Sequence, residues 1–169
     1  MIQTRRQKQT LSKSTRWLVA ALVLMLAVVA SRSHANPAAS GAKRRIFAQV
    51  LVESTVARHA ELAELELATI PTDGHDCTTI AATDVKEMGD KCDKGELAVM
   101  KTGKPTVEKE GDGYDVTLPL HVSGKTIGII GMDFKLDQKE SGLVDRASVI
   151  AKEVEDQIPE KSKLFEAAK

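Results

Sequence analysis

The strongest constraint on the fold is a stretch of alternating residues divided by Ser123-Gly124. Before this pair, every second side chain falls on one face of an extended strand: Tyr114, Val116, Leu118, Leu120 and Val122. Asp115, Thr117, Pro119 and His121 fall on the other face. A Ser-Gly pair between two such stretches is typical of a two-residue hairpin loop. The pattern predicts antiparallel strands over 114–122 and 125–135. The second is apolar on both faces, which predicts that both faces are covered.

The segments upstream extend this hairpin into a sheet. A strand over 105–110, turned by Gly111-Asp112-Gly113, completes a three-stranded meander. Further upstream, a short β-branched strand is predicted over 78–83. A helix is predicted over 94–101, and Gly103 suits its C-terminal cap.

The two ends of the folded region are predicted to be helical. Residues 43–69 contain no Gly or Pro and carry apolar residues at helical spacing, which predicts one long amphipathic helix. Its apolar surface either packs on a second copy, giving a homodimer, or lies along its own sheet. A second helical stripe runs from Leu143 to Ile158 and stops at Pro159. The expected fold is therefore α+β, with an antiparallel sheet, a long N-terminal helix and a C-terminal helix. The domain spans 43–158 and is followed by a charged tail over 159–169.

The N-terminus has the layout of a secretory signal peptide. A basic segment is followed by the apolar run Leu18 to Ala30 and by small residues at Ser33 and Ala35. The apolar run is shorter than the roughly 20 residues that a membrane-spanning helix needs. We expect residues 1–35 to be removed, 36–42 to be a linker, and the product to be periplasmic or secreted. The alternative is an uncleaved inner-membrane anchor over 17–32.

The charge balance excludes one class of partner. Six of the 24 Lys and Arg residues lie in the first 35 positions, whereas all 24 Asp and Glu residues lie beyond them, so residues 36–169 carry a net charge of −6. Such a domain lacks the basic surface that nucleic-acid phosphates require. No nucleophile–base pair, nucleotide fingerprint or metal-ligand cluster stands out, so an enzyme, a metal site and a cofactor are not expected. Haem ligation through His75 or His121 has no positive support.

The chain contains two cysteines, Cys77 and Cys92. They form no C-x-x-C motif, and no second ligand pair accompanies them as a structural zinc site requires. In an oxidising compartment two such thiols tend to pair. We therefore expect a disulfide, and the alternative is two unpaired, half-buried thiols.

Five segments, in this order, resemble the extracytoplasmic PAS-like sensor domains known as Cache or PDC domains. They are Thr79–Asp84, Gly89–Glu96, Val99–Pro105, Tyr114–Leu120 and Gly124–Asp133. The resemblance covers roughly residues 43–158, in a single-module form. It implies a ligand pocket between the sheet and the segment joining the first strand to the meander, which here comprises the cysteine loop and residues 94–104. The disulfide would then limit the movement of that roof.

Four polar residues of the meander are candidates for such a pocket. Asp133 is an acid in a strand expected to be covered on both faces, and a buried carboxylate needs a partner. That partner is either a ligand amino or hydroxyl group, or Lys135 or a backbone N–H. Asp115 and Thr117 share a face of the middle strand with His121. They converge on a ligand if that face is the pocket, and are ordinary surface residues if it is not.

Two further residues complete the candidate set. Tyr114, the single tyrosine, suits either a pocket rim or the core. Lys101 meets a ligand carboxylate or lies in an exposed turn. With these residues, we expect an exported sensory domain that binds a small organic ligand of the carboxylate or amino-acid class. It would signal through a partner such as a membrane receptor or kinase. The alternative is a non-catalytic periplasmic adaptor or dimerisation module without a pocket.

Overall fold

The computed structural model describes residues 45–111, 113–135 and 139–168, which belong to one compact unit. The expected signal peptide (1–35), linker (36–42) and alternative anchor (17–32) lie outside the described residues. Within the described ranges, no helix combines the length and apolar character needed to cross a bilayer.

Five antiparallel strands form one sheet in the order β2-β1-β5-β4-β3. The strands are β1 (Leu62–Thr69), β2 (Thr78–Ala82), β3 (Thr106–Glu110), β4 (Gly113–Val122) and β5 (Lys125–Phe134). The predicted meander is therefore confirmed as β3-β4-β5. Ser123 and Gly124 both have positive φ, as a tight hairpin between twisted strands requires.

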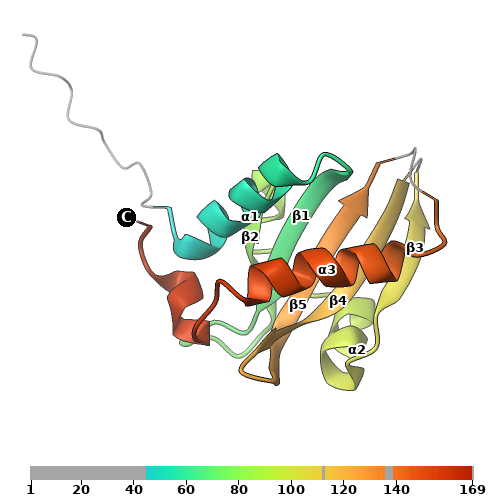
Figure 1. Cartoon of the computed structure of the whole chain (residues 1–169). Helices are drawn as coiled ribbons and strands as arrows, with labels where there is room; N and C mark the ends of the chain where they lie inside the picture. Colours follow the sequence, from blue (N-terminus) through green and yellow to red (C-terminus); the bar gives the residue numbers. More distant parts are fainter. Residues whose placement is uncertain (1–44, 112, 136–138, 169) are drawn as a thin grey trace, which may run out of the picture. The chain divides into compact units, whose positions relative to one another are not determined.

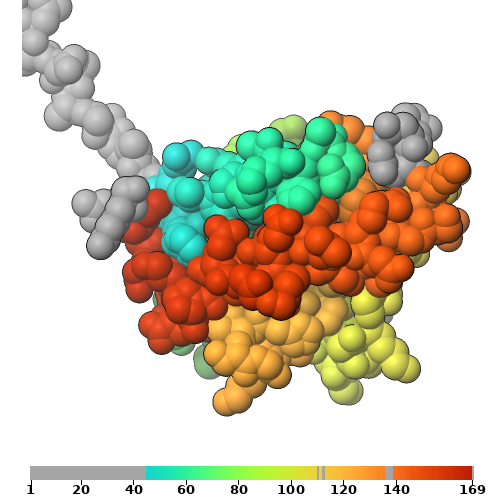
Figure 2. Space-filling model, viewed as in Figure 1, coloured from blue at the N-terminus to red at the C-terminus, as the bar shows by residue number. Residues whose placement is uncertain are grey.

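Two helices cover one face of this sheet (Figure 1). They are α1 (Phe47–Arg58) and α3 (Leu143–Glu155), and Figure 2 shows their side chains forming a continuous surface over that face. Their buried residues pack on the alternate strand positions that the sequence assigns to one face, including Val116, Leu118 and Leu120. The predicted α+β class and the C-terminal helix are confirmed.

The helix predicted over 43–69 is wrong in its second half. The helix ends at Arg58, and Leu62–Thr69 is strand β1, hydrogen-bonded between β2 and β5. A dimer through a 43–69 helix consequently loses its basis, because half of that segment lies inside the sheet.

The physical reason is that pairing overrides local preference. Leu, Glu and Ala are strong helix formers, so their composition favours a helix. In the strand, however, Leu65 and Leu67 turn into the core, while Glu64 and Glu66 turn to the opposite face. Strand pairing on both sides satisfies the backbone and buries both leucines, which outweighs helix propensity.

The second face of the sheet carries a smaller roof. It consists of a 3-10 turn, η1 (Val85–Glu87), and a short helix, α2 (Lys94–Thr102). Asp93 and Glu96 form a capping box at the start of α2, and Gly103 ends it in the left-handed conformation, as predicted.

A disulfide joins Cys77 to Cys92, as the sequence predicts, and lies beneath this roof. Cys77 packs with Val99 of α2 and with Ala68 and Ile129 of the sheet in a second, small apolar cluster. The Cys92 N–H also donates to the Cys77 carbonyl oxygen at 3.0 Å. The disulfide therefore fastens η1 and the start of α2 to the sheet.

The segment after α3 packs against the start of α1. It contains a 3-10 turn, η2 (Lys161–Phe165), in which Leu164 is fully buried. Ile46 forms an antiparallel bridge with Ala167, and the Phe47 N–H donates to the Glu166 carbonyl oxygen at 2.8 Å. This carbonyl satisfies one of the N–H groups that the first turn of a helix leaves without a partner.

Candidate functional site

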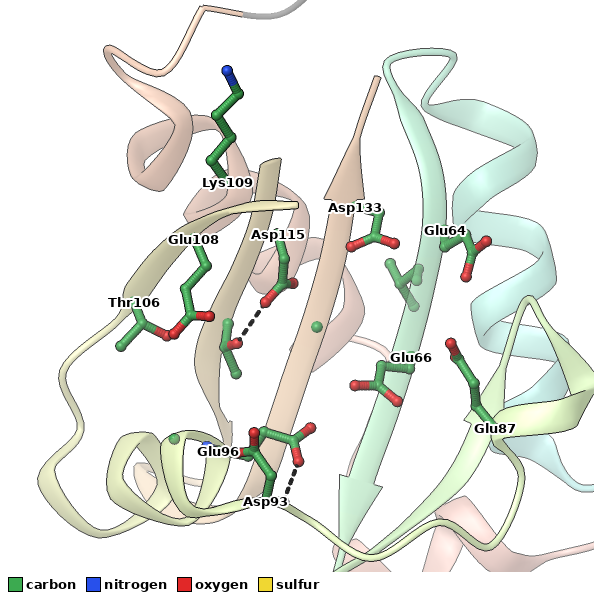
Figure 3. Close-up of a pocket in the computed structure, with 14 residues that line it drawn as sticks. Glu64, Glu66, Glu87, Asp93, Glu96, Thr106, Glu108, Lys109, Asp115 and Asp133 are labelled. Carbon is green, nitrogen blue, oxygen red and sulfur yellow. Dashed lines mark hydrogen bonds between the residues drawn. The ribbon is translucent and has the colours of Figure 1, made fainter. Parts of the chain in front are cut away.

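A cavity of about 450 Å³ lies between the sheet and the roof formed by η1 and α2 (Figure 3). This is the position that the sequence resemblance implies for a pocket. Its lining residues come from β1, β5, β4 and β3, and from η1 and the first turn of α2: Glu64, Leu65, Glu66, Glu87, Asp93, Gly95, Glu96, Thr106, Glu108, Lys109, Asp115, Thr117, Gly131 and Asp133.

Four carboxylates form a row across the floor of this cavity. Strand register pairs Glu64 of β1 with Asp133 of β5, Asp133 with Asp115 of β4, and Asp115 with Glu108 of β3. Neighbouring strands lie about 4.8 Å apart, so the row extends over about 14 Å. Like charges directly opposite each other destabilise a sheet. Strand pairing therefore brings four acidic side chains together on one face of the sheet.

The adjacent row is mostly neutral, and its middle position carries no side chain. Register places Glu66 of β1, Gly131 of β5 and Thr117 of β4 side by side. A β-carbon at Gly131 would lie 2.8 Å from Oε1 of Glu66 and 2.9 Å from its Cγ. Glycine at this position thus leaves the space in which the Glu66 side chain lies across β5.

The roof adds further carboxylates to those of the sheet. Glu87 enters from η1, and Asp93 and Glu96 enter from the capping box of α2 (Figure 3). The Glu96 N–H donates to Oδ1 of Asp93 at 2.8 Å, and the Asp93 N–H donates to Oε2 of Glu96 at 2.6 Å. The capping chemistry that starts α2 therefore also holds two acids at the cavity.

Crowding of these acids shifts their protonation. Burial, followed by the neighbouring charges of Glu96 and Glu87, raises the pKa of Glu66 to about 8, although a hydrogen bond from Thr79 opposes the shift. Burial, followed by the charges of Glu64, Asp84, Asp133 and Asp90, raises the pKa of Glu87. Both shifts have the direction expected for carboxyl groups that are buried beside other acids.

The charge of the lining is strongly unbalanced. Eight of the fourteen lining residues are acidic and one, Lys109, is basic. Figure 3 shows the amine of Lys109 directed away from the carboxylates. Among the residues that the structure describes, no three His, Cys, Asp or Glu side chains are grouped so that they could hold a metal ion.

Three of the six predicted site residues meet at this cavity. Asp133, Asp115 and Thr117 line it, and Thr117 Oγ1 donates to Oδ2 of Asp115 at 3.3 Å. They share the face of the meander that the sequence assigns to them, and the structure identifies that face as the one beneath the roof.

The other three predicted site residues lie elsewhere. Tyr114 packs against the core on the α1–α3 face. His121 accepts or donates at Nδ1 with Glu155 of α3 at 3.1 Å, and its N–H donates to the same carboxylate at 2.6 Å. Lys101 is exposed near the end of α2 and does not line the cavity. Strand alternation places Tyr114 on the core face with Val116 and Leu118. The contact of His121 depends instead on the packing of α3 and on the strand irregularity at Leu120/His121.

The acids of β1 and of the roof were missed by the sequence prediction. Glu64 and Glu66 fall within the segment predicted as a helix, although their alternation with Leu65 and Leu67 is also the signature of a strand with one acidic face. Glu87, Asp93 and Glu96 lie in polar segments. The sequence alone does not show that these segments fold over the sheet and direct the three acids into the cavity.

The space at Gly131 leads to a specific prediction. Gly131→Ala would push the Glu66 side chain off β5 toward solvent, because its new β-carbon overlaps the far end of a flexible side chain rather than backbone. We expect the pKa of Glu66 to fall from about 8 toward its ordinary 4.5. An NMR pH titration of the glutamate carboxyl carbons measures this directly. An unchanged titration would show that the pKa of Glu66 does not depend on the space left by Gly131.

Comparison with known proteins identifies the fold. No protein-family model matches the sequence, and no curated protein matches it. The structure matches the second GAF domain of DevS from Mycobacterium smegmatis, with a TM-score of 0.51 and 8% identity over 64% of this chain and 88% of that one. It also matches the type II free methionine-R-sulfoxide reductase from Thermoplasma acidophilum, with a TM-score of 0.51 and 14% identity over 70% of this chain and 92% of that one.

These likenesses establish a GAF- and PAS-like fold and nothing narrower. The PAS-like part of the predicted resemblance is thereby supported, whereas the Cache assignment stays a proposal. One of the two matched proteins is an enzyme, so the fold alone does not decide between catalytic and non-catalytic roles.

Proposed function

We propose that this chain is a sensory domain whose cavity binds a linear organic cation with more than one ammonium group. The observation that carries the proposal is the row of four carboxylates on the cavity floor, formed by Glu64, Asp133, Asp115 and Glu108. A row about 14 Å long suits an extended chain with separated positive charges better than a compact one. Ammonium groups can donate charge-assisted hydrogen bonds to carboxylates spaced in this way.

The same lining argues against a carboxylate ligand. A second anion would meet eight acidic side chains and one lysine that is directed away. The acids are also distributed over four strands and the roof instead of converging on a point, which favours an organic cation over a metal ion. The ligand class expected from the resemblance is therefore replaced by amines.

The sensory part of the proposal is supported by the order of the Cache-like sequence segments, the PAS-like fold and the cavity under the roof. Together with the signal peptide predicted for residues 1–35, these features suggest an exported domain that passes its liganded state to a membrane receptor or kinase. The roof is the part of the domain that such a partner would contact, because α2 and η1 carry cavity residues and are otherwise mostly exposed.

Calorimetric titration of the full chain with putrescine, spermidine, n-butylamine and butyrate tests the ligand class. We expect putrescine and spermidine to bind, n-butylamine to bind more weakly, and butyrate not to bind. Asp115→Asn combined with Asp133→Asn should lower the affinity for putrescine by about a hundredfold or more, because each of the two lost charge-assisted hydrogen bonds contributes about 1.5–3 kcal/mol.

A matched variant distinguishes the loss of cavity carboxylates from a change in the overall charge of the protein. Asp73→Asn combined with Glu160→Gln removes the same charge from exposed positions outside the cavity, and should leave the affinity unchanged. Competition by Mg²⁺ or Ca²⁺ at equal concentration identifies a metal site instead. The proposal fails if butyrate binds more tightly than putrescine, or if the cavity variant binds putrescine as well as the wild-type chain.

A further inference from the structure

The outer edge of β2, at one end of the sheet, is closed by the chain itself. The Thr79 N–H donates to the Asp90 carbonyl oxygen at 2.9 Å, and the Thr79 carbonyl oxygen accepts from the Gly89 N–H at 2.9 Å. Further along, the side-chain amide of Gln49 pairs with the backbone of Ala82. Its Nε2 donates to the Ala82 carbonyl oxygen at 2.9 Å, and its Oε1 accepts from the Ala82 N–H at 3.3 Å. A further strand therefore cannot pair with β2 without displacing these partners.

The outer edge of β3, at the other end of the sheet, has no such cover. β3 is the last strand in the sheet order and pairs with β4 alone, and Figure 1 shows it at the margin of the sheet. Within the described ranges, the backbone of residues 106–109 makes no hydrogen bond outside the β3–β4 ladder. Every second residue of an edge strand directs its N–H and C=O groups away from the sheet, where another strand can pair with them.

The side chains of β3 define the kind of strand that fits this edge. Thr106 and Glu108 line the cavity, whereas Val107 packs against the core on the helix-covered face. An added strand continues the sheet, so its side chains alternate between the same two faces. On the cavity face they lie beside Glu108, an exposed acid, and opposite charges on neighbouring strands stabilise their pairing. The edge therefore favours Lys or Arg on the cavity face and apolar side chains beside Val107.

A second copy of this chain fits the same edge poorly. Antiparallel pairing of two β3 strands would join the two cavity faces into one continuous face, so the carboxylate row that ends at Glu108 would continue into the row of the other copy. Like charges on neighbouring strands destabilise their pairing. Residues 36–169 also carry a net charge of −6, which opposes close approach of two copies. These charges favour a different partner with basic side chains.

We propose that the free edge of β3 binds an extended segment of a partner protein in which basic and apolar side chains alternate. Main-chain hydrogen bonds to β3 hold the segment, while Glu108 and Val107 select its side chains on the two faces. The inference goes beyond the proposed function, because the edge of β3 can pair with a strand whether or not the cavity holds an amine.

Hydrogen exchange of the full chain, followed by NMR for each amide, tests this edge. The probe is a short capped peptide in which lysine and valine alternate. At saturation it should slow exchange of the outward-facing β3 amides by about tenfold or more, and leave the Thr79 and Ala82 amides unchanged because they already have partners. The same peptide with every backbone N–H methylated keeps its side chains but cannot donate, so it should protect no β3 amide. A peptide with glutamate in place of lysine should bind about tenfold more weakly.

Charge reversal at the edge gives a second test. Glu108→Lys should reverse the preference between the lysine and glutamate peptides, and Glu108→Gln should reduce it. Glu160→Lys makes the same change at an exposed position outside β3 and should leave the preference as in the wild type.

Three results would overturn the inference: equal β3 protection by the methylated peptide, protection confined to other strands, or an unchanged preference in Glu108→Lys. Protection of β3 that rises with protein concentration in the absence of peptide would also overturn it, and would identify a second copy as the occupant. Putrescine titration is independent of these measurements, so its failure would remove the proposed ligand and leave the strand-binding edge standing.

Discussion

Gly128→Ala is expected to lower the free energy of unfolding by more than about 4 kcal/mol, which is exceptional for adding one methyl group. Gly128 lies inside β5, paired with Thr69 of β1 on one side and Leu120 of β4 on the other. A β-carbon there would lie 2.1 Å from the carbonyl oxygen of Ala68 and 2.9 Å from Cβ of Thr69. The obstructing atom belongs to the backbone of a paired strand, so relief requires that β1 and β5 separate.

Gly131→Ala is the natural control for this variant. It adds the same methyl group to the same strand, but meets the movable end of Glu66. We expect it to cost about 1–2 kcal/mol, within the usual range for overpacking. Urea unfolding of the two variants compares them directly. Equal losses of unfolding free energy would contradict a close approach of the β1 backbone to Gly128.

Removing the disulfide should produce the second large loss. The bond closes a loop with a sequence separation of 15 residues, and replacing Cys77 and Cys92 together by alanine should lower the free energy of unfolding by about 3 kcal/mol. The loss should extend to the cavity, because the bond packs beneath Val99, the buried residue of α2. A looser α2 would carry Asp93 and Glu96 away from the floor, so putrescine affinity should fall as well.

Reduction provides the control for this prediction. Dithiothreitol should destabilise the wild-type chain by a similar amount and leave the double variant unaffected. Iodoacetamide should label neither cysteine in the unreduced protein, since both are in the disulfide. Labelling of the unreduced chain, or a double variant as stable as the wild type, would show that the bond does not fasten the roof.

The sequence predicts those elements whose periodicity has one interpretation. The meander, α2 with its C-terminal glycine cap, and α3 all follow from strand alternation, turn residues or a single helical stripe. Residues 62–69 have two interpretations, because Ala63 and Leu67 continue the stripe of α1 while Leu65 and Leu67 alternate with glutamates. Local preference selects the wrong one, since the deciding interactions are hydrogen bonds to β2 and β5, which are distant in sequence.

The lining of the cavity was likewise predictable only where it depends on strands that are neighbours in sequence. Asp115, Thr117 and Asp133 follow from alternation within the meander, because those strands are neighbours in sequence and in space. Glu64 joins their row only because β1 pairs with β5, a contact across more than sixty residues that no local pattern encodes. Tyr114 and His121 were plausible by residue type, but their neighbours are set by packing against the core and α3.

The bridge between Ile46 and Ala167 also bears on the order in which the domain can be completed. α1 is the first helix of the described chain, yet its first turn is capped by the carbonyl of Glu166, beside the buried Leu164. A chain synthesised from its N-terminus therefore has α1 early but cannot seal it until residue 166 has emerged. The contacts that cap the first helix are therefore among those that cannot form until the C-terminal segment has been synthesised.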